Sequence, residues 1–387
     1  MSLPTARRAQ EIEAFQVMDV LARAHALEAA GRRVLHMEIG EPDFTAPEPV
    51  VEAAIRALRD GRTAYTATLG LPSLRQAIAR HYGTRFKTKV DEKRIAITSG
   101  ASGGLLTVAA LYVNPGDEIL VPDPGYPGYR HFVRAFEGVA RPLAVSPESD
   151  FQPTAAMVEK AWTNRTKGVL LGSPSNPTGT LIEPAELQKI ARLVEKRNGV
   201  LIVDEIYQGL VYGVDPSTAL GLPGNVVVVN SFSKYFCMTG WRLGWVVLPE
   251  QSVREFEKLA QHLFIAAPSV AQHAALAAFS PESIAVLEER RAEFARRRDL
   301  YLLELRKSLA VPAEPRGAFY VYAGCGGDAK RFCLELLNRE AVAATPGIDF
   351  GANGTERCVR FAYTRPLPEL EDAAARIRRF AASWRAA

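Results

Sequence analysis

A lysine follows a run of β-branched residues, at a place where its amine could act as a nucleophile. Lys234 comes directly after VVVVNSFS, so it lies at the end of a predicted buried strand. An amine held there can lose its proton and attack a carbonyl carbon. Ser231, Ser233 and Arg242 are close in sequence, and hydroxyls with a guanidinium are groups that hold a phosphate dianion. A lone loop lysine is most often a solvated surface group, so this Schiff-base interpretation depends on its neighbours.

Two other charged residues stand in apolar surroundings. Asp204 ends an apolar strand, where a carboxylate needs a cation or hydrogen-bond donors, or else caps a following helix. Glu205 faces the other side of the sheet, so the two acids do not form a glycosidase pair. Arg360 lies in the apolar run CVRFAYT, which predicts either a bidentate anion such as a carboxylate or an internal salt bridge.

A glycine-rich loop, GASGG at residues 100–104, follows a predicted strand and precedes a helical pattern. Its backbone N–H groups and the helix dipole would form a cradle for an anion such as phosphate, although a plain turn fits the loop equally well. The loop also matches G-x-S-x-G, the nucleophile elbow of serine hydrolases. A rival hypothesis is therefore a hydrolase with Ser102 as nucleophile and a later histidine, such as His273, as base.

Short apolar runs separated by helical patterns must position these residues. The runs are Ile95–Thr98, Ile119–Val121, Val169–Leu171, Val200–Val203, Val226–Val229 and Trp245–Leu248. Runs without alternation predict strands covered on both faces, and their spacing predicts an α/β fold with a mostly parallel sheet sandwiched by helices. Polar segments follow the first five runs: Gly100-Ala101-Ser102, Asp123 to Tyr126, Ser175 to Gly179, Asp204 to Tyr207, and Ser231 to Lys234. Because ligands bind outside the carboxyl ends of parallel strands, the five segments are expected to converge on one site.

The rest of the chain predicts a second, smaller α+β domain. A long charged helix begins near residue 283, and strand-like segments follow at 318–322 and 358–363. An amphipathic helix at 17–30 opens the chain. We expect an N-terminal arm and helix at 1–45 that join the small domain, a large domain at 46–285 and a small domain at 286–387.

The composition of the chain argues against several classes of binding partner. The 387 residues contain 47 Lys and Arg against 43 Asp and Glu, a small and dispersed surplus that favours no nucleic acid. No apolar stretch reaches the roughly 18 residues of a membrane span, and no signal peptide is apparent, so we expect a cytoplasmic protein. The six histidines form no H-E-x-x-H or i,i+4 pair, so no metal site is expected.

Taken together, these motifs resemble those of the class I and II aminotransferases, the fold type I enzymes that use pyridoxal 5′-phosphate (PLP). The motifs, in the family's order, are IGEPDF (39–44), SPSNPTG (173–179), VDEIY (203–207), SFSK with MTGWRLG (231–244) and VRFAYT (359–364). SNPTG together with S-x-S-K-x(7)-R is highly specific for the family. The hydrolase hypothesis leaves SNPTG and SFSK unexplained.

The resemblance implies a role for each matched residue. Lys234 would form the internal aldimine with PLP and then move the proton between Cα and the cofactor, while Asp204 would keep the pyridine nitrogen protonated. Asn176 and Tyr207 would bind the phenolic oxygen of the ring, and Tyr126 would stack on it. The implied phosphate ligands are Ala101, Ser102, Ser231, Ser233, Arg242 and, from the partner subunit of a homodimer, Tyr65. Arg360, helped by the N–H of Gly40 and by Asn176, would grip the substrate carboxylate.

Other outcomes stay open at this point. The same residues support other fold type I reactions, such as those of C–S lyases and decarboxylases, since they create a carbanion without dictating its fate. A transcription regulator with an aminotransferase-like domain would need a DNA-binding module, and fewer than 40 residues precede the first motif. The expected reaction is transfer of an amino group from an L-amino acid to a 2-oxo acid. No clear second arginine in the chain certifies a dicarboxylate substrate, although the partner subunit could supply one.

Overall fold

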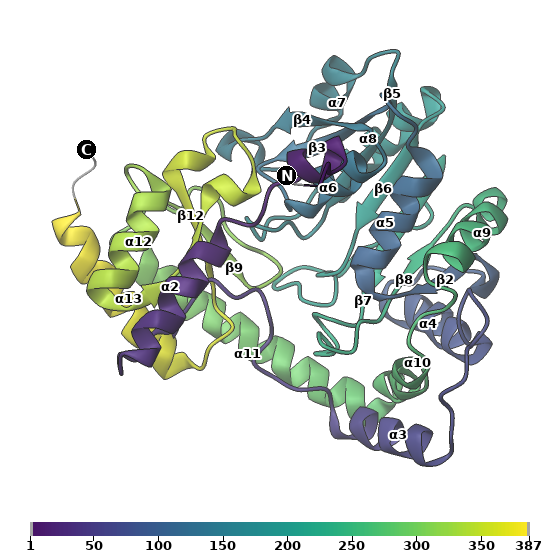
Figure 1. Cartoon of the computed structure of the whole chain (residues 1–387), viewed down its shortest axis with the longest axis horizontal. Coiled ribbons are helices and arrows are strands. Elements are labelled where there is room, and N and C mark those ends of the chain that lie inside the picture. The colour runs from purple at the N-terminus through teal and green to yellow at the C-terminus, as the bar shows by residue number, and fades with distance from the viewer. Residues whose placement is uncertain (1–2, 385–387) are drawn as a thin grey trace.

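A seven-stranded sheet forms the centre of the computed structural model, which describes residues 3–384 (Figure 1). The strand order is β2-β8-β7-β6-β5-β3-β4. The strands are β2 (Ile95–Thr98), β3 (Glu118–Asp123), β4 (Val139–Ala144), β5 (Thr166–Gly172), β6 (Val200–Asp204), β7 (Asn225–Ser231) and β8 (Gly244–Val247). All six predicted strands are present, and the predicted mostly parallel sheet is confirmed.

Strand β8 is antiparallel to both of its neighbours, so β2 and β7 on either side of it run in the same direction. The five strands followed by polar segments therefore all end at the same edge of the sheet. The sequence analysis missed β4, which lies at the other end of the sheet. Most of its residues are partly or fully exposed and it contains Pro142, so it lacks the apolar run that marks the buried strands.

Helices cover both faces of this sheet. Along β5 and β6, Val169, Leu171 and Val203 pack into one buried cluster, while Leu170 and Ile202 pack into another. Because successive side chains of a strand point to opposite faces, these strands are buried on both sides, which is why their sequences are continuously apolar. The covering helices are α4 (Pro72–Arg85), α5 (Gly100–Tyr112), α6 (Gly128–Ala135), α7 (Ala155–Ala161), α8 (Pro184–Lys196), α9 (Val253–Leu263) and α10 (Ser269–Ala275).

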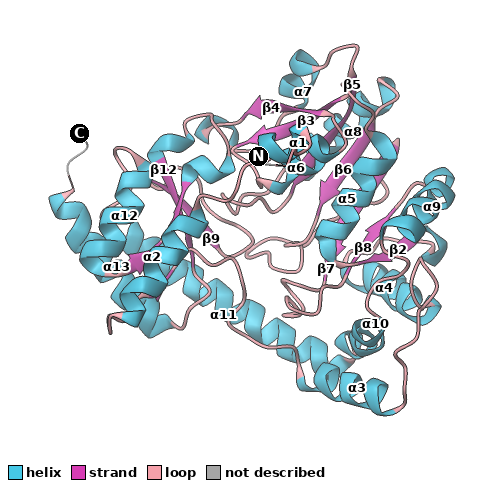
Figure 2. Ribbon diagram, viewed as in Figure 1, coloured by secondary structure: helices cyan, strands magenta, loops and turns pink. Residues whose placement is uncertain are grey.

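A smaller α+β unit lies beside the large sheet (Figure 2). Its three-stranded antiparallel sheet has the order β11-β12-β9, from Thr345–Pro346, Cys358–Ala362 and Tyr320–Gly324. Helices α12 (Ala329–Glu340) and α13 (Leu367–Ser383) pack on this unit, and α11 (Pro281–Leu305) runs from it toward α10 and α3 (Glu48–Arg59). The boundary near residue 285 falls inside α11 and stays a prediction.

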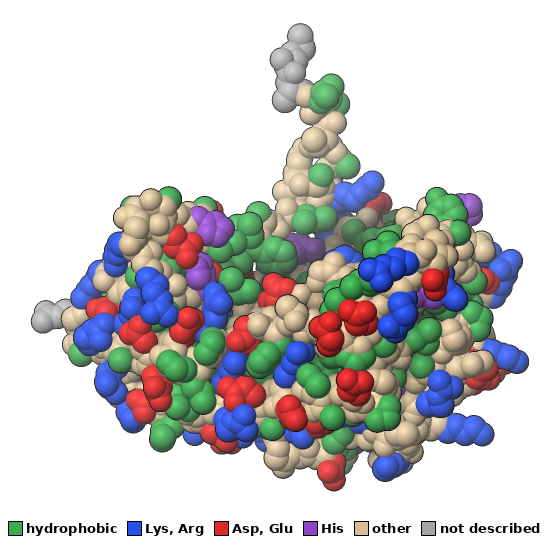
Figure 3. Space-filling model, turned by 90° about the horizontal axis from the view of Figure 1, so that it is seen from below, with side chains coloured by type: hydrophobic (Ala, Val, Ile, Leu, Met, Phe, Trp, Pro, Cys, Tyr) green, Lys and Arg blue, Asp and Glu red, His purple; other side chains and the backbone are tan. Residues whose placement is uncertain are grey.

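The N-terminal segment contacts the smaller unit. Strand β1 (Leu35–His36) pairs in parallel with β10 (Val342–Ala343), and α2 (Val17–Ala29) packs on α12. Ahead of α2, the segment with α1 (Arg7–Glu11) has no buried residue, and Figure 3 shows it projecting from the body of the molecule. Short 3-10 helices complete the described chain: η1 (Glu92–Arg94), η2 (Pro147–Ser149), η3 (Glu250–Ser252), η4 (Leu276–Phe279), η5 (Gly347–Phe350) and η6 (Thr355–Arg357). Within residues 3–384, no helix is long and apolar enough to cross a membrane.

Candidate active site

A cavity of about 420 Å³ opens at the carboxyl ends of the parallel strands, between the large sheet and the smaller unit. The five polar segments meet there, as the sequence analysis predicted. The predicted site residues that line the cavity are Gly40, Ala101, Ser102, Tyr126, Asn176, Asp204, Tyr207, Ser231, Ser233, Lys234, Arg242 and Arg360. Tyr65 does not line it, and its side chain is 80% exposed.

Lys234 places its amine inside this cavity. Its Nζ donates a hydrogen bond of 2.7 Å to the carbonyl oxygen of Gly40. Burial, helped by the positive charge of Arg360, lowers the pKa of Lys234 to about 8. The free amine, which a nucleophile or a base requires, therefore forms at much lower pH than for an ordinary lysine.

Asp204 is the buried acid of the site, with 3% of its surface exposed. Tyr129 donates its hydroxyl to Oδ2 at 2.9 Å, and the N–H of Ile206 donates to Oδ1 at 3.2 Å. Burial raises the pKa of Asp204 to about 6, and these two hydrogen bonds oppose the rise. A turn and not a helix follows β6, so the helix-cap alternative is wrong. The carboxylate has no cation partner within ion-pair distance among residues 3–384, and it is available for a cationic ligand.

The glycine-rich loop has the shape of an anion cradle. Helix α5 begins at Gly100 and has no side-chain cap, so its first N–H groups are free to bind an anion. A Cβ at Gly100 would lie 2.9 Å from Nη2 of Arg242, and one at Gly244 would lie 2.8 Å from the backbone nitrogen of Ala101. Ser231 donates its hydroxyl to that of Ser233 at 2.9 Å. The chain thus brings hydroxyls, backbone N–H groups and a guanidinium together, and a phosphate group fits this donor set.

Arg360 holds its positive charge without an acid beside it. Nη1 donates to Oδ1 of Asn176 at 2.9 Å, and Nη2 donates to the backbone oxygen of Glu38 at 2.7 Å. The guanidinium lies over the rings of Tyr320 and Phe350, at 4.3 and 5.0 Å from their centroids. Among residues 3–384 no carboxylate forms an ion pair with it, and Nε has no partner. The alternative of an internal salt bridge, considered from the sequence, is therefore wrong. The guanidinium group of Arg360 is available for an anion.

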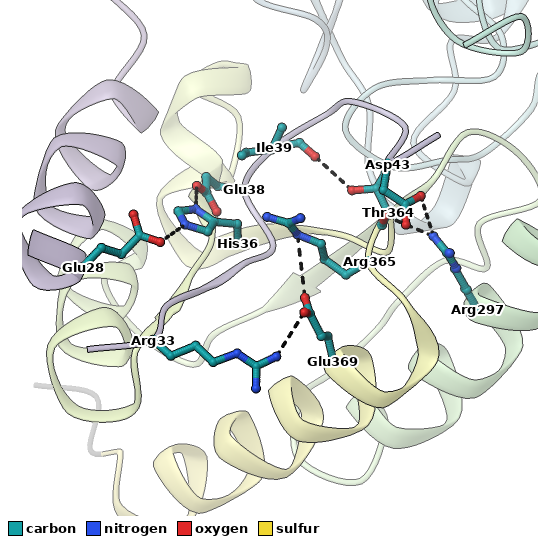
Figure 4. Close-up of polar contacts among 10 residues, drawn as sticks. All are labelled: Glu28, Arg33, His36, Glu38, Ile39, Asp43, Arg297, Thr364, Arg365 and Glu369. Atoms are coloured by element: carbon teal, nitrogen blue, oxygen red, sulfur yellow. Dashed lines mark hydrogen bonds and ion pairs between the residues drawn. The ribbon is translucent and has the colours of Figure 1, made fainter. Parts of the chain in front are cut away.

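The segment that carries Gly40 is fixed on both sides (Figure 4). His36 lies between two acids, with Nδ1 2.7 Å from Glu38 and Nε2 3.0 Å from Glu28, and the hydrogen bond to Glu38 raises the pKa of His36 to about 9. Farther along, Arg297 donates to Asp43 at 2.8 Å. This backbone accepts from both Arg360 and Lys234, so its position sets the distance between the two cations.

Several residues of the cavity were missed by the sequence analysis. They are Tyr129, Tyr320, Thr345, Asp349 and Phe350, with Phe15, Val17 and Leu21 from the N-terminal segment. Tyr129 could have been found, because it follows Tyr126 by three residues in the sequence. The hydroxyls of Tyr207 and Tyr320 lie 2.8 Å apart. The hydroxyl of Tyr320 is also close to Gly40, where an added Cβ would lie 2.3 Å from it. A side chain at position 40 would therefore displace the buried ring of Tyr320.

The hydrolase alternative lacks the histidine base that it requires. Ser102 lines the cavity, but none of the described lining residues is a histidine. His273 lies on α10 and is not among the residues that line the cavity. The hydrolase hypothesis requires a histidine base within hydrogen-bond reach of the serine, and the described residues of the cavity include none.

Comparison with known proteins agrees with this geometry. Residues 32–377 match the family described as aminotransferase class I and II. A valine–pyruvate aminotransferase of Mycobacterium tuberculosis is 39% identical over 94% of this chain and 95% of that relative. A (5-formylfuran-3-yl)methyl phosphate transaminase of Methanocaldococcus jannaschii is 37% identical over 97% and 98% of the two chains. The crystal structure of an aminotransferase from Mycobacterium tuberculosis superposes with a TM-score of 0.95 at 38% identity, and covers 99% of this chain and all of that one.

The family match covers most of the chain, and the relatives align with it over nearly their whole lengths. Lys234, Asp204 and Arg360 line one cavity, as the sequence analysis expected of them. This chain therefore belongs to the aminotransferase class I and II family, a family of generally PLP-dependent enzymes, and it is a transaminase.

Proposed function

We propose that this transaminase binds PLP through Lys234 and moves the amino group of an L-amino acid to a 2-oxo acid. The observation that carries the proposal is the charge pattern of the cavity: a buried amine of lowered pKa, a buried acid without a cation, and an arginine without an acid. PLP, when bound, supplies an aldehyde that takes up amino groups and a ring that withdraws electrons from Cα.

Each part of the cofactor has matching groups in the cavity. The carboxylate of Asp204, oriented by the hydroxyl of Tyr129, would hold a proton at the pyridine nitrogen. Asn176 and Tyr207 would bind the phenolic oxygen, and Tyr126 would cover the ring face. The implied phosphate ligands are the backbone and side chains of Ala101 and Ser102, with Ser231, Ser233 and Arg242.

Lys234 would move a proton at Nζ to and from the substrate Cα. Since its pKa is lowered to about 8, the fraction of free amine rises as pH passes through 8 rather than through the ordinary lysine value of about 10.4. Labelling of the apoenzyme with trinitrobenzenesulfonate, followed by peptide mapping, should therefore show half-maximal reactivity of Lys234 near pH 8. A midpoint above 10 would contradict this role of the buried environment.

Arg360 would grip the substrate α-carboxylate with two parallel hydrogen bonds. Replacing it with lysine keeps the charge but removes the planar fork, so Arg360→Lys should raise KM for every amino donor roughly 10²-fold. Initial rates over a range of donor concentrations measure this effect. The matched control is Arg357→Lys, just ahead of the same strand and exposed, and it should leave KM unchanged; an unchanged KM in Arg360→Lys would remove the residue from the substrate site.

We further propose that the chain acts as a homodimer in the cytoplasm, with Tyr65 contributing to the partner's phosphate site. The support is the position of Tyr65: an aromatic side chain that is 80% exposed and outside its own cavity. Sedimentation velocity gives the mass of the particle, and a monomer would contradict the shared site.

Two measurements test the proposed function. Borohydride reduction of the purified enzyme, then digestion and mass spectrometry, should find the pyridoxyl group on the peptide with Lys234. A screen of amino donors against pyruvate and 2-oxoglutarate should find transfer of the amino group. Release of thiol or carbon dioxide without amino transfer would favour a C–S lyase or a decarboxylase instead.

A further inference from the structure

A buried histidine lies between two acids, just ahead of the backbone that carries Gly40 (Figure 4). Nδ1 of His36 is 2.7 Å from Oε1 of Glu38, and Nε2 is 3.0 Å from Oε1 of Glu28. An ionised carboxylate can only accept hydrogen bonds, so both ring nitrogens must donate. A histidine that donates from both nitrogens is an imidazolium, and the raised pKa of His36, about 9, agrees with this geometry.

His36 is the counter-ion of Glu38. Among residues 3–384, no other cation lies within ion-pair distance of this carboxylate. Glu38 is 3% exposed, and its Oε2 is buried without a hydrogen-bond partner. Because Oε2 is already covered within one chain, a partner subunit cannot bring a second cation to it. The other titratable groups of the neighbourhood are His25 and Arg365, near Glu28, and Cys333 of α12, near Glu38.

Glu38 begins the part of the segment that no strand holds. The backbone pairing of β1 with β10 ends at the N–H of Met37, which donates to the oxygen of Ala343 at 3.0 Å. The backbone oxygen of Glu38 instead accepts from Nη2 of Arg360 at 2.7 Å and from the hydroxyl of Thr345 at 3.2 Å. The place of Glu38 therefore sets the orientation of the guanidinium.

Building on the proposed function, in which Arg360 grips the substrate α-carboxylate, we infer that His36 is a positioning residue for Arg360. Its charge and its hydrogen bond hold the side chain of Glu38, and the backbone oxygen of Glu38 orients the guanidinium. A buried carboxylate without a cation is costly. Loss of the imidazolium should therefore displace Glu38 and, with it, the guanidinium.

The charge of His36 is tested in the apoenzyme, so that the measurement needs neither cofactor nor turnover. Nitrogen-15 NMR of the histidine rings at pH 8 should show a proton on both ring nitrogens of His36, where a histidine with the ordinary pKa of about 6.5 is neutral. The signals are assigned by their loss in His36→Gln. A His36 ring with one unprotonated nitrogen at this pH overturns the inference.

The positioning role is tested with the PLP-loaded enzyme. His36→Gln should raise KM for every amino donor about tenfold and change kcat less than about threefold, because the grip on the α-carboxylate is weakened before the reaction begins. Adding Glu38→Gln to this variant should restore most of the KM, since no buried charge then lacks a cation. An unchanged KM in His36→Gln, or a KM that stays raised in the double variant, overturns the inference.

Two control variants separate positioning from general stability. Asp328→Ala removes the cap of α12 in the same unit, where Asp328 accepts from the N–H of Arg331 at 2.6 Å. It should lower Tm and leave KM unchanged. His25→Gln makes the same substitution at an exposed position of α2 and should change neither. If Asp328→Ala raises KM as His36→Gln does, the effect comes from lost stability and the positioning role is wrong.

Two further comparisons keep the outcome decisive. If His36→Gln does not fold, the double variant is compared with Glu38→Gln alone, and the two should have the same KM; a KM about tenfold higher in the double variant overturns the inference. An unchanged KM in Arg360→Lys contradicts the proposed function itself. An unchanged KM in His36→Gln together with a raised KM in Arg360→Lys contradicts only the role of His36.

Discussion

Replacing Lys234 with alanine should lower the rate of amino transfer at least about 10⁴-fold. The variant loses both the nucleophile that joins the cofactor and the base that moves the Cα proton, and a positioned base alone contributes roughly 10²–10⁴-fold. PLP should still bind through the phosphate cradle, because Ser231, Ser233 and Arg242 are unchanged. Single-turnover measurements with the PLP-loaded variant separate the chemical step from cofactor binding.

A control variant and a rescue experiment test this prediction further. Lys189→Ala removes a largely exposed lysine of α8 and should leave the rate unchanged. A small amine such as ethylamine, added to Lys234→Ala, should restore part of the rate because it can enter the cavity as a base. A variant that retains more than a tenth of the wild-type rate would exclude Lys234 from the reaction.

Replacing Asp204 with asparagine should lower kcat about 10²–10³-fold while the protein remains folded. Asparagine has the same shape and can still accept the hydroxyl of Tyr129, but it carries no negative charge to hold a proton at the ring nitrogen. The absorbance spectrum of the bound cofactor reports the protonation of the ring independently of turnover. Glu205→Gln is the matched control, because Glu205 is buried next to Asp204 but does not line the cavity.

The same substitution should stabilise the apoenzyme above pH 6. Burial raises the pKa of Asp204 from 3.8 to about 6, so the folded state holds this proton more tightly than the unfolded state does. Between those two values stability falls as pH rises, and above pH 6 the whole penalty is present, about 3 kcal/mol in wild type. Asp204→Asn removes the penalty, so its Tm without cofactor should exceed that of wild type at pH 8 and approach it at pH 4. A lower Tm at pH 8 would contradict the unpaired buried charge.

The sequence predicted the central sheet well because its strands are buried on both faces. Continuous apolar runs such as Val200–Val203 are typical of strands that are buried on both faces. The residue after each run then lies at the carboxyl end of its strand. The position of Asp204 and Lys234 in one cavity follows from this regularity. The edge strand β4 was not predicted, because most of its side chains are partly or fully exposed and its sequence therefore has no continuous apolar run.

The sequence by itself determined the buried strands of the sheet, the family motifs and the residues expected to hold the cofactor and the substrate carboxylate. Only the tertiary structure decided which groups surround them. The hydrogen bond from Arg360 to the backbone of Glu38 joins residues more than 300 positions apart, and the pairing of Tyr207 with Tyr320 joins two different units. No local pattern encodes such contacts, because their free energy depends on where separate elements pack and not on the neighbours of either residue in the chain.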